Sequence, residues 1–226
     1  MCDTTINRIR TLLTPVLDRS GFVVGSGRDT LCPDPLYVIG ENPGGGERQH
    51  AGPEHTIAAS LDSLPEHRNG FVDDGSLTSP FYKNVEFVFQ RLGRDPAGVF
   101  CTNALFVRSS SSKTNQRRSE QWKLCWPVHQ LFLDVVKPKV VLCLGAYAFD
   151  RLRVIGGAIT SATDPDGPAR DGWLRRSARF ELSSGQQRMC TLVGIPHPGG
   201  LTGNTMWPLG PAALAKLDLV RALISA

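Results

Sequence analysis

The chain has 226 residues, of which 41% are hydrophobic and 20% are charged, and its formal net charge is +4. This composition is typical of a globular protein, and the length favours a single domain over residues 1–226. No apolar run approaches the roughly eighteen residues of a membrane span, and the first residues lack a secretory segment. We therefore expect a cytoplasmic, monomeric protein that is not bound to a membrane; the mild positive charge is compatible with nucleic acid but does not require it.

The first half of the chain predicts two helices around a strand and a long loop. Helical spacing covers 4–21, within a lead-in formed by residues 1–30, and a short apolar strand follows at 36–40. Residues 44–79 are rich in Gly, Pro, Ser and Asp, which predicts a long loop. A second helix begins after Ser79 as N-cap, with Pro80 at its first position and Gly93 as its stop.

The second half predicts three more strands and three more helices. We expect strands at 98–107, 139–145 and 188–195, and helices at 119–138, 146–156 and 210–225. Ser119 is the expected cap of the first of these helices and Pro127 its expected bend. Residues 108–118 and 156–186 are polar and are predicted as loops. Because the strands are short and apolar on both faces, the pattern predicts a three-layer α/β/α fold with a central four-stranded, mainly parallel sheet.

Two of the predicted strands end in similar loops, "ENPGGG" at 41–46 and "PHPGG" at 196–200. Ligands of open parallel sheets bind beyond the carboxyl ends of the strands, and glycines allow a ligand to approach the backbone. The first loop has the glycine spacing of a P-loop, but Gly46 and Glu47 replace its Lys-Ser/Thr pair, so we expect no nucleotide cofactor.

Four segments in order, "GENPG", "TNALFV", "KPKVVLCLGAYA" and "HPGGL", resemble the uracil-DNA glycosylase superfamily over roughly residues 36–215. Glu41 matches the GEAPG form of the first motif, whereas Asn42 matches the GINPG and GMNPG forms of the mismatch-specific and single-strand-selective branches. The last segment is similar to the HPSPL loop of another branch. The resemblance implies a DNA glycosylase, an enzyme that extrudes a base from DNA and hydrolyses its N-glycosidic bond.

The resemblance implies three catalytic residues. His197 would donate to the base O2, where negative charge develops as the bond breaks, and Asn42 would position the water. An amide cannot take a proton, so we expect slower chemistry than in relatives with Asp at this position. Glu41 would serve as base or electrostatic stabiliser, although a solvent-facing carboxylate at a strand end is an equal alternative.

Base recognition is assigned to the strand-end amide of Asn103, which suits uracil in one orientation and cytosine when flipped. A flipped base also needs an aromatic floor, for which Phe71, Phe81 and Tyr82 are the candidates. Gly44 stands where the GQDPYH form of the motif has a tyrosine that blocks C5, so we expect the pocket to admit 5-substituted pyrimidines.

DNA contacts are expected from the second glycine loop and from basic loops. Leu201 would wedge into the gap left by the flipped base, and Gly199 and Gly200 would present N–H groups to phosphates. The candidates for phosphate contact in the basic loops are Lys113, Arg117, Arg118, Arg175, Arg176 and Arg179.

The six cysteines form no CxxC pair, and we expect buried, reduced thiols. Some branches of the family hold an iron–sulfur cluster, but here only Cys125 falls near a ligand position. We therefore predict no cluster and no metal or other cofactor.

The substrate is expected to be uracil or a 5-substituted or otherwise modified pyrimidine. The sharper alternative is a bulky hypermodified cytosine of phage DNA, such as glucosylated hydroxymethylcytosine, which would make the protein an antiviral defence enzyme rather than a DNA repair enzyme. A catalytically weak DNA-binding relative and a nucleotide-dependent enzyme are the remaining alternatives.

Overall fold

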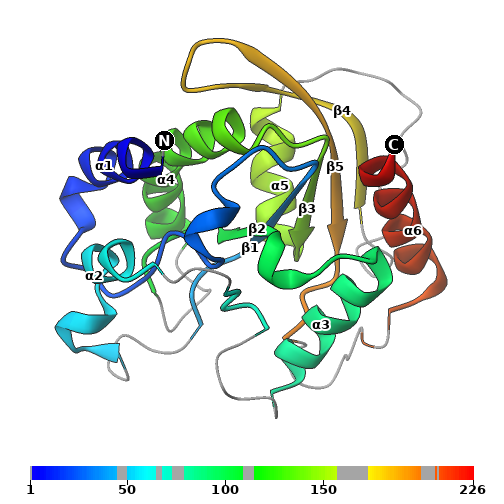
Figure 1. Ribbon diagram of the computed structural model, residues 1–226, viewed down its shortest axis with the longest axis horizontal. Helices are drawn as coiled ribbons and strands as arrows, with labels where there is room; N and C mark the ends of the chain where they lie inside the picture. Colours follow the sequence, from blue (N-terminus) through cyan, green and yellow to red (C-terminus); the bar gives the residue numbers. More distant parts are fainter. Residues whose placement is uncertain are drawn as a thin grey trace.

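The fold is built on a central five-stranded sheet (Figure 1). The computed structural model describes residues 2–44, 50–64, 68–72, 79–108, 115–156, 173–199, 207 and 209–226, with the backbone alone at 2, 115–117 and 173–177. Four neighbouring strands are parallel, and the last is antiparallel at one edge. Their spatial order is β2 (Phe100–Asn103), β1 (Leu36–Gly40), β3 (Val140–Leu144), β5 (Gln187–Ile195) and β4 (Trp173–Glu181).

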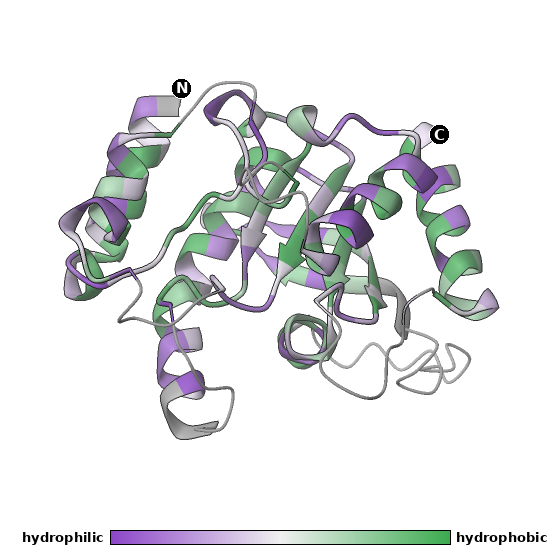
Figure 2. Ribbon diagram, turned by 90° about the horizontal axis from the view of Figure 1, so that it is seen from below, coloured by the Kyte–Doolittle hydropathy of each residue, from purple (hydrophilic) through white to green (hydrophobic). Residues whose placement is uncertain are grey.

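Helices cover both faces of this sheet, which confirms the predicted α/β/α layering. One hydrophobic cluster joins the sheet to α1, α4 and α5, and a second joins its other face to α3 and α6. Figure 2 shows the hydrophobic residues concentrated in the sheet and on the helix faces that meet it. The helices are α1 (Cys2–Leu12), α2 (Ile57–Asp62), α3 (Pro80–Leu92), α4 (Asn115–Val136), α5 (Ala146–Ile155) and α6 (Pro211–Ser225). Among the described residues, none of the helices combines the length and apolarity of a membrane span.

The sheet has five strands, so the prediction of four was wrong. The fifth, β4, lies inside the stretch 156–186 that was predicted as a loop. It forms a hairpin with β5 at the sheet edge, where buried Ala178 and Phe180 alternate with exposed Arg179. Charged residues are common on edge strands because they discourage pairing with a strand of another chain, and here they obscure the apolar pattern.

Several element boundaries also differ from the prediction. The first helix ends at Leu12 and gives way to a 3-10 turn at Thr14–Val16, because Pro15 lacks the N–H that an α-helix would need. The helix expected from Ser119 begins one turn earlier, at Asn115, and Pro127 lies within it. β2 ends at Asn103, although the strand was predicted to continue to residue 107.

The helix α3 forms as predicted, with Ser79 as N-cap and Pro80 at the first position. Gly93 ends it with φ +65°, a left-handed conformation that favours glycine, and its N–H donates to the carbonyl of Gln90. This helix brings Phe81 and Tyr82 to the carboxyl edge of the sheet.

A fully buried histidine lies beneath the end of β2. His129 Nε2 donates to the carbonyl of Ala104, at 3.0 Å, and its Nδ1 accepts from the Tyr37 hydroxyl, at 2.8 Å. Burial lowers the pKa of His129 to about 4, so the ring is neutral at pH 7 and both of its nitrogens are satisfied.

This histidine predicts a loss of stability in acid. The folded pKa of about 4 lies below the ordinary 6.5, so the stabilisation is complete above pH 6.5 and is lost as the pH falls toward 4. The loss should reach roughly 3 kcal/mol at pH 4. Urea unfolding at pH 7 and pH 4 measures it, with His129→Gln as the matched variant. The lowered pKa of His197 also reduces stability in acid, so the contribution of His129 is the difference in pH dependence between the wild type and the variant. An equal pH dependence of the unfolding free energy in both proteins would contradict the account.

Candidate active site

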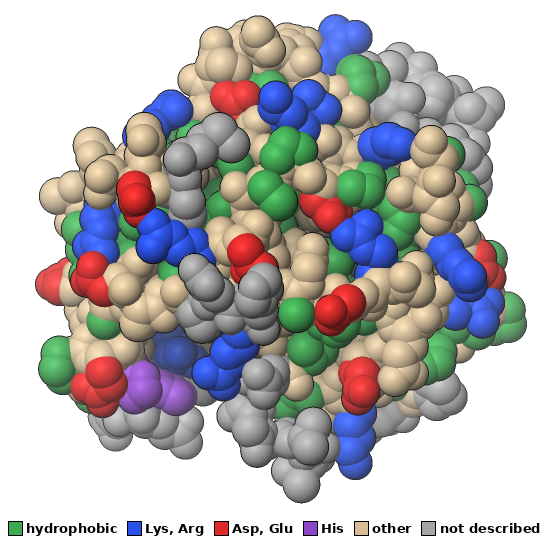
Figure 3. Space-filling view, viewed as in Figure 1, with side chains coloured by type: hydrophobic (Ala, Val, Ile, Leu, Met, Phe, Trp, Pro, Cys, Tyr) green, Lys and Arg blue, Asp and Glu red, His purple; other side chains and the backbone are tan. Residues whose placement is uncertain are grey.

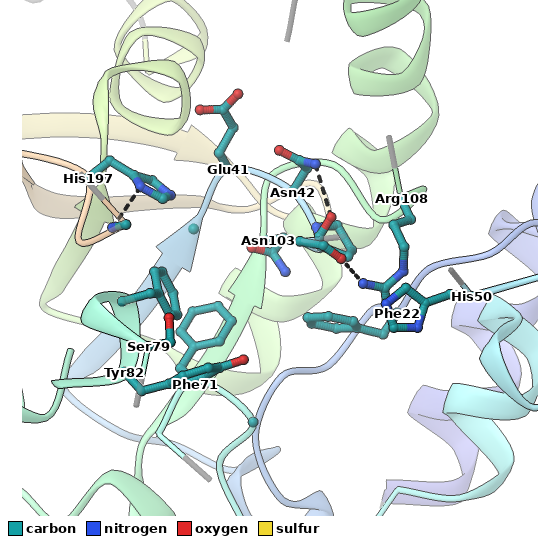
Figure 4. A pocket seen from close by; sticks show the side chains of 16 residues that line it. Phe22, Glu41, Asn42, His50, Phe71, Ser79, Tyr82, Asn103, Arg108 and His197 are labelled. Carbon is teal, nitrogen blue, oxygen red and sulfur yellow. Dashed lines mark hydrogen bonds between the residues drawn. The ribbon is translucent and has the colours of Figure 1, made fainter. Parts of the chain in front are cut away.

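A pocket of about 720 Å³ opens at the carboxyl ends of the parallel strands (Figure 4). Glu41 and Asn42 follow β1, and Asn103 ends the neighbouring strand β2. His197 follows β5, which lies two strands from β1 on the other side. The chain leaves β1 toward β2 on one side and returns to β3 on the other, which is the switch point where such sheets bind ligands. The structure therefore gathers four of the predicted polar residues around one pocket.

Asn42 is held with its amide oxygen available. Its Nδ2 donates to the carbonyl of Pro43, at 3.1 Å, as the dashed line in Figure 4 marks. The side chain is half-buried at the pocket wall. Its Oδ1 can therefore accept a hydrogen bond from a water molecule or from a ligand hydroxyl.

Asn103 presents an unsatisfied amide to the pocket. The residue is 4% exposed, and its Nδ2 has no hydrogen-bond partner among the described residues. Figure 4 shows the side chain in the middle of the pocket, above Phe71. Leaving a buried donor unpaired costs free energy, so the geometry favours a ligand that brings an acceptor to this atom.

The packing of Asn103 explains the glycine at the end of β1. Gly40 lies directly across from Asn103 in the parallel ladder. A Cβ at Gly40 would lie 2.5 Å from Asn103 Oδ1, so only glycine allows the amide its position. At Gly44, by contrast, an added Cβ would have none of the described atoms within 4 Å.

His197 is fixed as a neutral hydrogen-bond donor. The Gly199 N–H donates to His197 Nδ1, at 3.0 Å, so in the neutral ring the proton is on Nε2. Burial lowers the pKa of His197, while Glu41 raises it to a smaller extent. The neutral form therefore predominates at pH 7, with an N–H available to a ligand.

Neighbouring elements hold the loop that carries His197. Trp207 Nε1 donates to the His197 carbonyl, at 3.1 Å, and Asn84 Nδ2 on α3 donates to the Pro198 carbonyl, at 2.8 Å. Gly145, with φ +109°, follows β3 behind the imidazole, where a Cβ would lie 3.3 Å from His197 Cβ. The loop is thus bonded to Trp207 and to α3 and packs closely against Gly145, which keeps the imidazole in place.

Glu41 is committed to an ion pair. Its carboxylate accepts from Arg118 on α4, and the two side chains are 23% and 13% exposed. The Arg118 guanidinium also lies over the ring of Tyr147, 4.7 Å from its centroid. Figure 4 shows Glu41 pointing away from Asn103 and Phe71. This arrangement suits an electrostatic role better than a general base, and it engages Arg118, a predicted phosphate contact, within the protein.

The three predicted aromatic residues all line the pocket. The rings of Phe71 and Phe81 meet edge to face with centroids 6.1 Å apart, and Phe81 and Tyr82 meet in the same way at 5.3 Å. Buried Asn69 fixes the position of Phe71, because its Oδ1 accepts from the Phe71 N–H at 2.9 Å. The cluster provides an apolar wall opposite Asn42.

The structure brings fewer of the predicted DNA contacts to the site. Gly199 lines the pocket, but its N–H is bonded to His197 and is not free for a phosphate. Arg179 pairs with Met189 in the ladder of β4 and β5 and does not line the pocket. The remaining predicted contacts lie outside the described side chains: Lys113, Arg117, Arg175, Arg176, Gly200 and Leu201.

Seven pocket residues were not predicted as part of the site. Gly40 and Pro43 belong to the "GENPG" segment, and the other five are Phe22, His50, Gly70, Ser79 and Arg108. Of these five residues, only Arg108 could have been found from the sequence, because it directly follows the "TNALFV" segment that carries Asn103. The others come from the lead-in and the 44–79 loop, whose path the sequence does not predict.

Charge and cysteines add little to the site. Figure 3 shows acidic and basic side chains interspersed over one face of the molecule, without a patch of one sign. As predicted, buried thiols predominate: Cys101, Cys125, Cys143 and Cys190 are free and buried, whereas Cys32 is free and exposed. Within the described part of the chain, no three His, Cys, Asp or Glu side chains are grouped to hold a metal ion.

No protein-family model matches the chain, and no curated protein is significantly similar to it.

Proposed function

We propose that the protein is a monofunctional DNA glycosylase that flips a pyrimidine into the pocket and hydrolyses its N-glycosidic bond, leaving an abasic site. The observation that carries the proposal is the convergence of three polar groups on one pocket: a neutral His197 donor, the unpaired Asn103 amide and the Asn42 amide oxygen. The proposed partner is DNA, bound by a cytoplasmic monomer without a nucleotide or metal cofactor.

The three groups divide the chemistry among them. Asn103 would bind the Watson–Crick edge of the flipped base, which lies against the aromatic wall, and His197 Nε2–H would reach its O2. As the bond from C1′ to the base breaks, its electron pair moves onto the base and the His197 hydrogen bond stabilises the charge on O2. Asn42 Oδ1 would orient the water that attacks C1′. Solvent takes the proton of that water and protonates the departed base, because the amide can do neither.

The negative charge of Glu41 gives the site a further electrostatic element. A carboxylate near the sugar favours the positive charge that develops at C1′, and its pairing with Arg118 fixes its position. This role needs no proton transfer, so it is compatible with the ion pair.

The open space at Gly44 supports a base with a substituent at C5. Within the described part of the chain, no atom lies within 4 Å of a Cβ added there. The pocket volume of about 720 Å³ falls in the range of pockets for drug-sized ligands, which is larger than a bare pyrimidine ring requires. Uracil stays within the proposed substrates. A bulky hypermodified cytosine, as in phage DNA, is the alternative that this space favours, and it would give the enzyme a role in antiviral defence rather than in repair.

The proposal is tested by incubating the protein with labelled oligonucleotides, single- and double-stranded, that each carry one candidate base. Alkali cleaves DNA at abasic sites, so cleavage at the candidate position is the expected result. The Asn42→Ala/His197→Ala double variant should give none while still binding DNA. Binding without cleavage of any substrate by the wild type would favour the catalytically weak relative, and equal cleavage by the double variant would refute the site.

A matched pair of glycine substitutions tests the base-reading role of Asn103. Gly40→Ala forces the Asn103 amide to move, whereas the added methyl of Gly44→Ala has none of the described atoms within 4 Å. We expect Gly40→Ala to slow base release about tenfold or more, the loss of one hydrogen bond, and Gly44→Ala to stay within about twofold of wild type. Single-turnover rates measure this, after thermal melting has verified that both variants fold. Equal rates in the two variants would contradict the role.

A further inference from the structure

The pocket continues past Gly44 into a second polar region that the proposed chemistry does not use. Figure 4 shows Phe22, His50 and Arg108 together on the side opposite His197, with Asn103 between the two groups. All of them line the same pocket. The region combines an aromatic ring with two nitrogen-bearing side chains.

Arg108 brings an unsatisfied donor to this region. One of its terminal nitrogens donates to the carbonyl of Gly44, which fixes the guanidinium beside the open space. Its Nε is buried and has no hydrogen-bond partner among the described residues, and no described carboxylate forms an ion pair with it. A guanidinium can only donate, so the group that completes it must offer acceptors.

His50 adds a second unsatisfied atom. Its Nδ1 is buried and without a partner within the described part of the chain, and its ring meets His55 edge to face at 4.8 Å. Burial, Arg108 and His55 lower the pKa of His50, so the ring is neutral at pH 7 and its Nδ1 can accept or donate.

The orientation of a bound base directs C5 into this region. With O2 at His197 and the Watson–Crick edge at Asn103, C5 lies on the far side of the ring from O2. That is the side of Gly44 and Arg108, and no described atom would contact a Cβ added at Gly44. Arg108 lines the pocket on this side, and one of its terminal nitrogens is held at the Gly44 carbonyl, so its guanidinium lies where a substituent at C5 would extend.

We propose that Phe22, His50 and Arg108 form a specificity subsite for a C5 substituent that carries hydrogen-bond acceptors, such as a hydroxymethyl group or a larger hydroxylated group. The assignment rests on the proposed base-excision function. Arg108 and His50 hydrogen-bond the oxygens of the substituent, and Phe22 packs against its carbon skeleton. A methyl group fits the same space but leaves the two buried nitrogens unpaired, so it is discriminated against.

The test compares release of cytosine, 5-methylcytosine, 5-hydroxymethylcytosine and its glucosylated form, and of the uracil series, from oligonucleotides of one sequence. The wild type should release hydroxylated bases at least about tenfold faster than 5-methyl bases. In Arg108→Met and His50→Ala, the ratio of rates for hydroxylated and methylated bases should fall toward one. Arg8→Met, which removes an exposed arginine on α1, should leave the ratio unchanged. An unchanged ratio in both pocket variants, or a wild-type ratio near one, would overturn the subsite.

A binding measurement separates this inference from the proposed function. The Asn42→Ala/His197→Ala double variant, with and without Arg108→Lys or Arg108→Met, is titrated with the same oligonucleotides by fluorescence anisotropy, after melting curves have verified folding. Tighter binding of hydroxylated than of methylated bases, lost in Arg108→Met, is the expected result. If the wild type releases no base from any DNA, the proposed function fails, and the affinity ratio still decides the subsite: equal affinities refute it.

Discussion

Replacing His197 by alanine is expected to slow base release by roughly 10²- to 10³-fold, the usual effect of removing one preorganised donor to a developing negative charge. The physical reason is the fixed tautomer. Gly199 occupies Nδ1, so the proton on Nε2 is available where charge develops on the base O2. The measurement is a single-turnover rate with enzyme in excess, which isolates the chemical step from product release.

The control for this substitution is His55→Ala. His55 is a half-buried histidine that does not line the pocket, so its removal should leave the rate within about twofold. DNA affinity should change little in the His197 variant, because one donor that acts at the transition state contributes little to ground-state binding. A His197→Ala rate close to wild type would show that another group stabilises the departing base.

Replacing Asn42 by alanine should slow release by roughly 10²-fold, because the attacking water loses the acceptor that orients it. The amide is already fixed by its bond to the Pro43 carbonyl, so it positions water without reorganisation. Affinity for DNA should be largely retained. The rate is again measured under single-turnover conditions.

The Asn42→Asp variant tests the same assignment in the opposite direction. A carboxylate can accept the proton of the water and carries negative charge near C1′, so release should be at least as fast as in the wild type at pH 7. Its rate should fall in acid as the new carboxyl is protonated, a dependence that the wild-type amide cannot cause. A rate below that of Asn42→Ala at pH 7 would contradict the assignment.

Much of the core site follows from the sequence because it depends on strand ends. Asn103 ends β2, whereas Asn42 and His197 stand two residues beyond the ends of β1 and β5, whose last residues are buried; parallel strands bring their carboxyl ends to one edge. The fold class followed from the same pattern. The glycine at position 40 has a local cause: a side chain there would collide with the amide of Asn103, its neighbour across the ladder.

The rest of the site could not be predicted because it depends on contacts between distant segments. Arg118 pairs with Glu41 across 77 positions, and Arg108 bonds to Gly44 across 64. The first contact engages Arg118, which was predicted to bind phosphate, within the protein. The second holds Arg108, which was not predicted as part of the site, at the pocket wall. Strand β4 escaped prediction for a different reason, because an edge strand with one buried face carries arginines that resemble a loop.

Mass spectrometry of the free bases released from a panel of DNAs is the most direct test of the central claim. The panel contains uracil, thymine, cytosine, 5-hydroxymethylated and glucosylated bases, and the Asn42→Ala/His197→Ala double variant is run in parallel. The account predicts an intact pyrimidine base in solution and one abasic site for each base released, with the wild type only. Failure to release a base from every DNA in the panel, or equal release by the double variant, would contradict it.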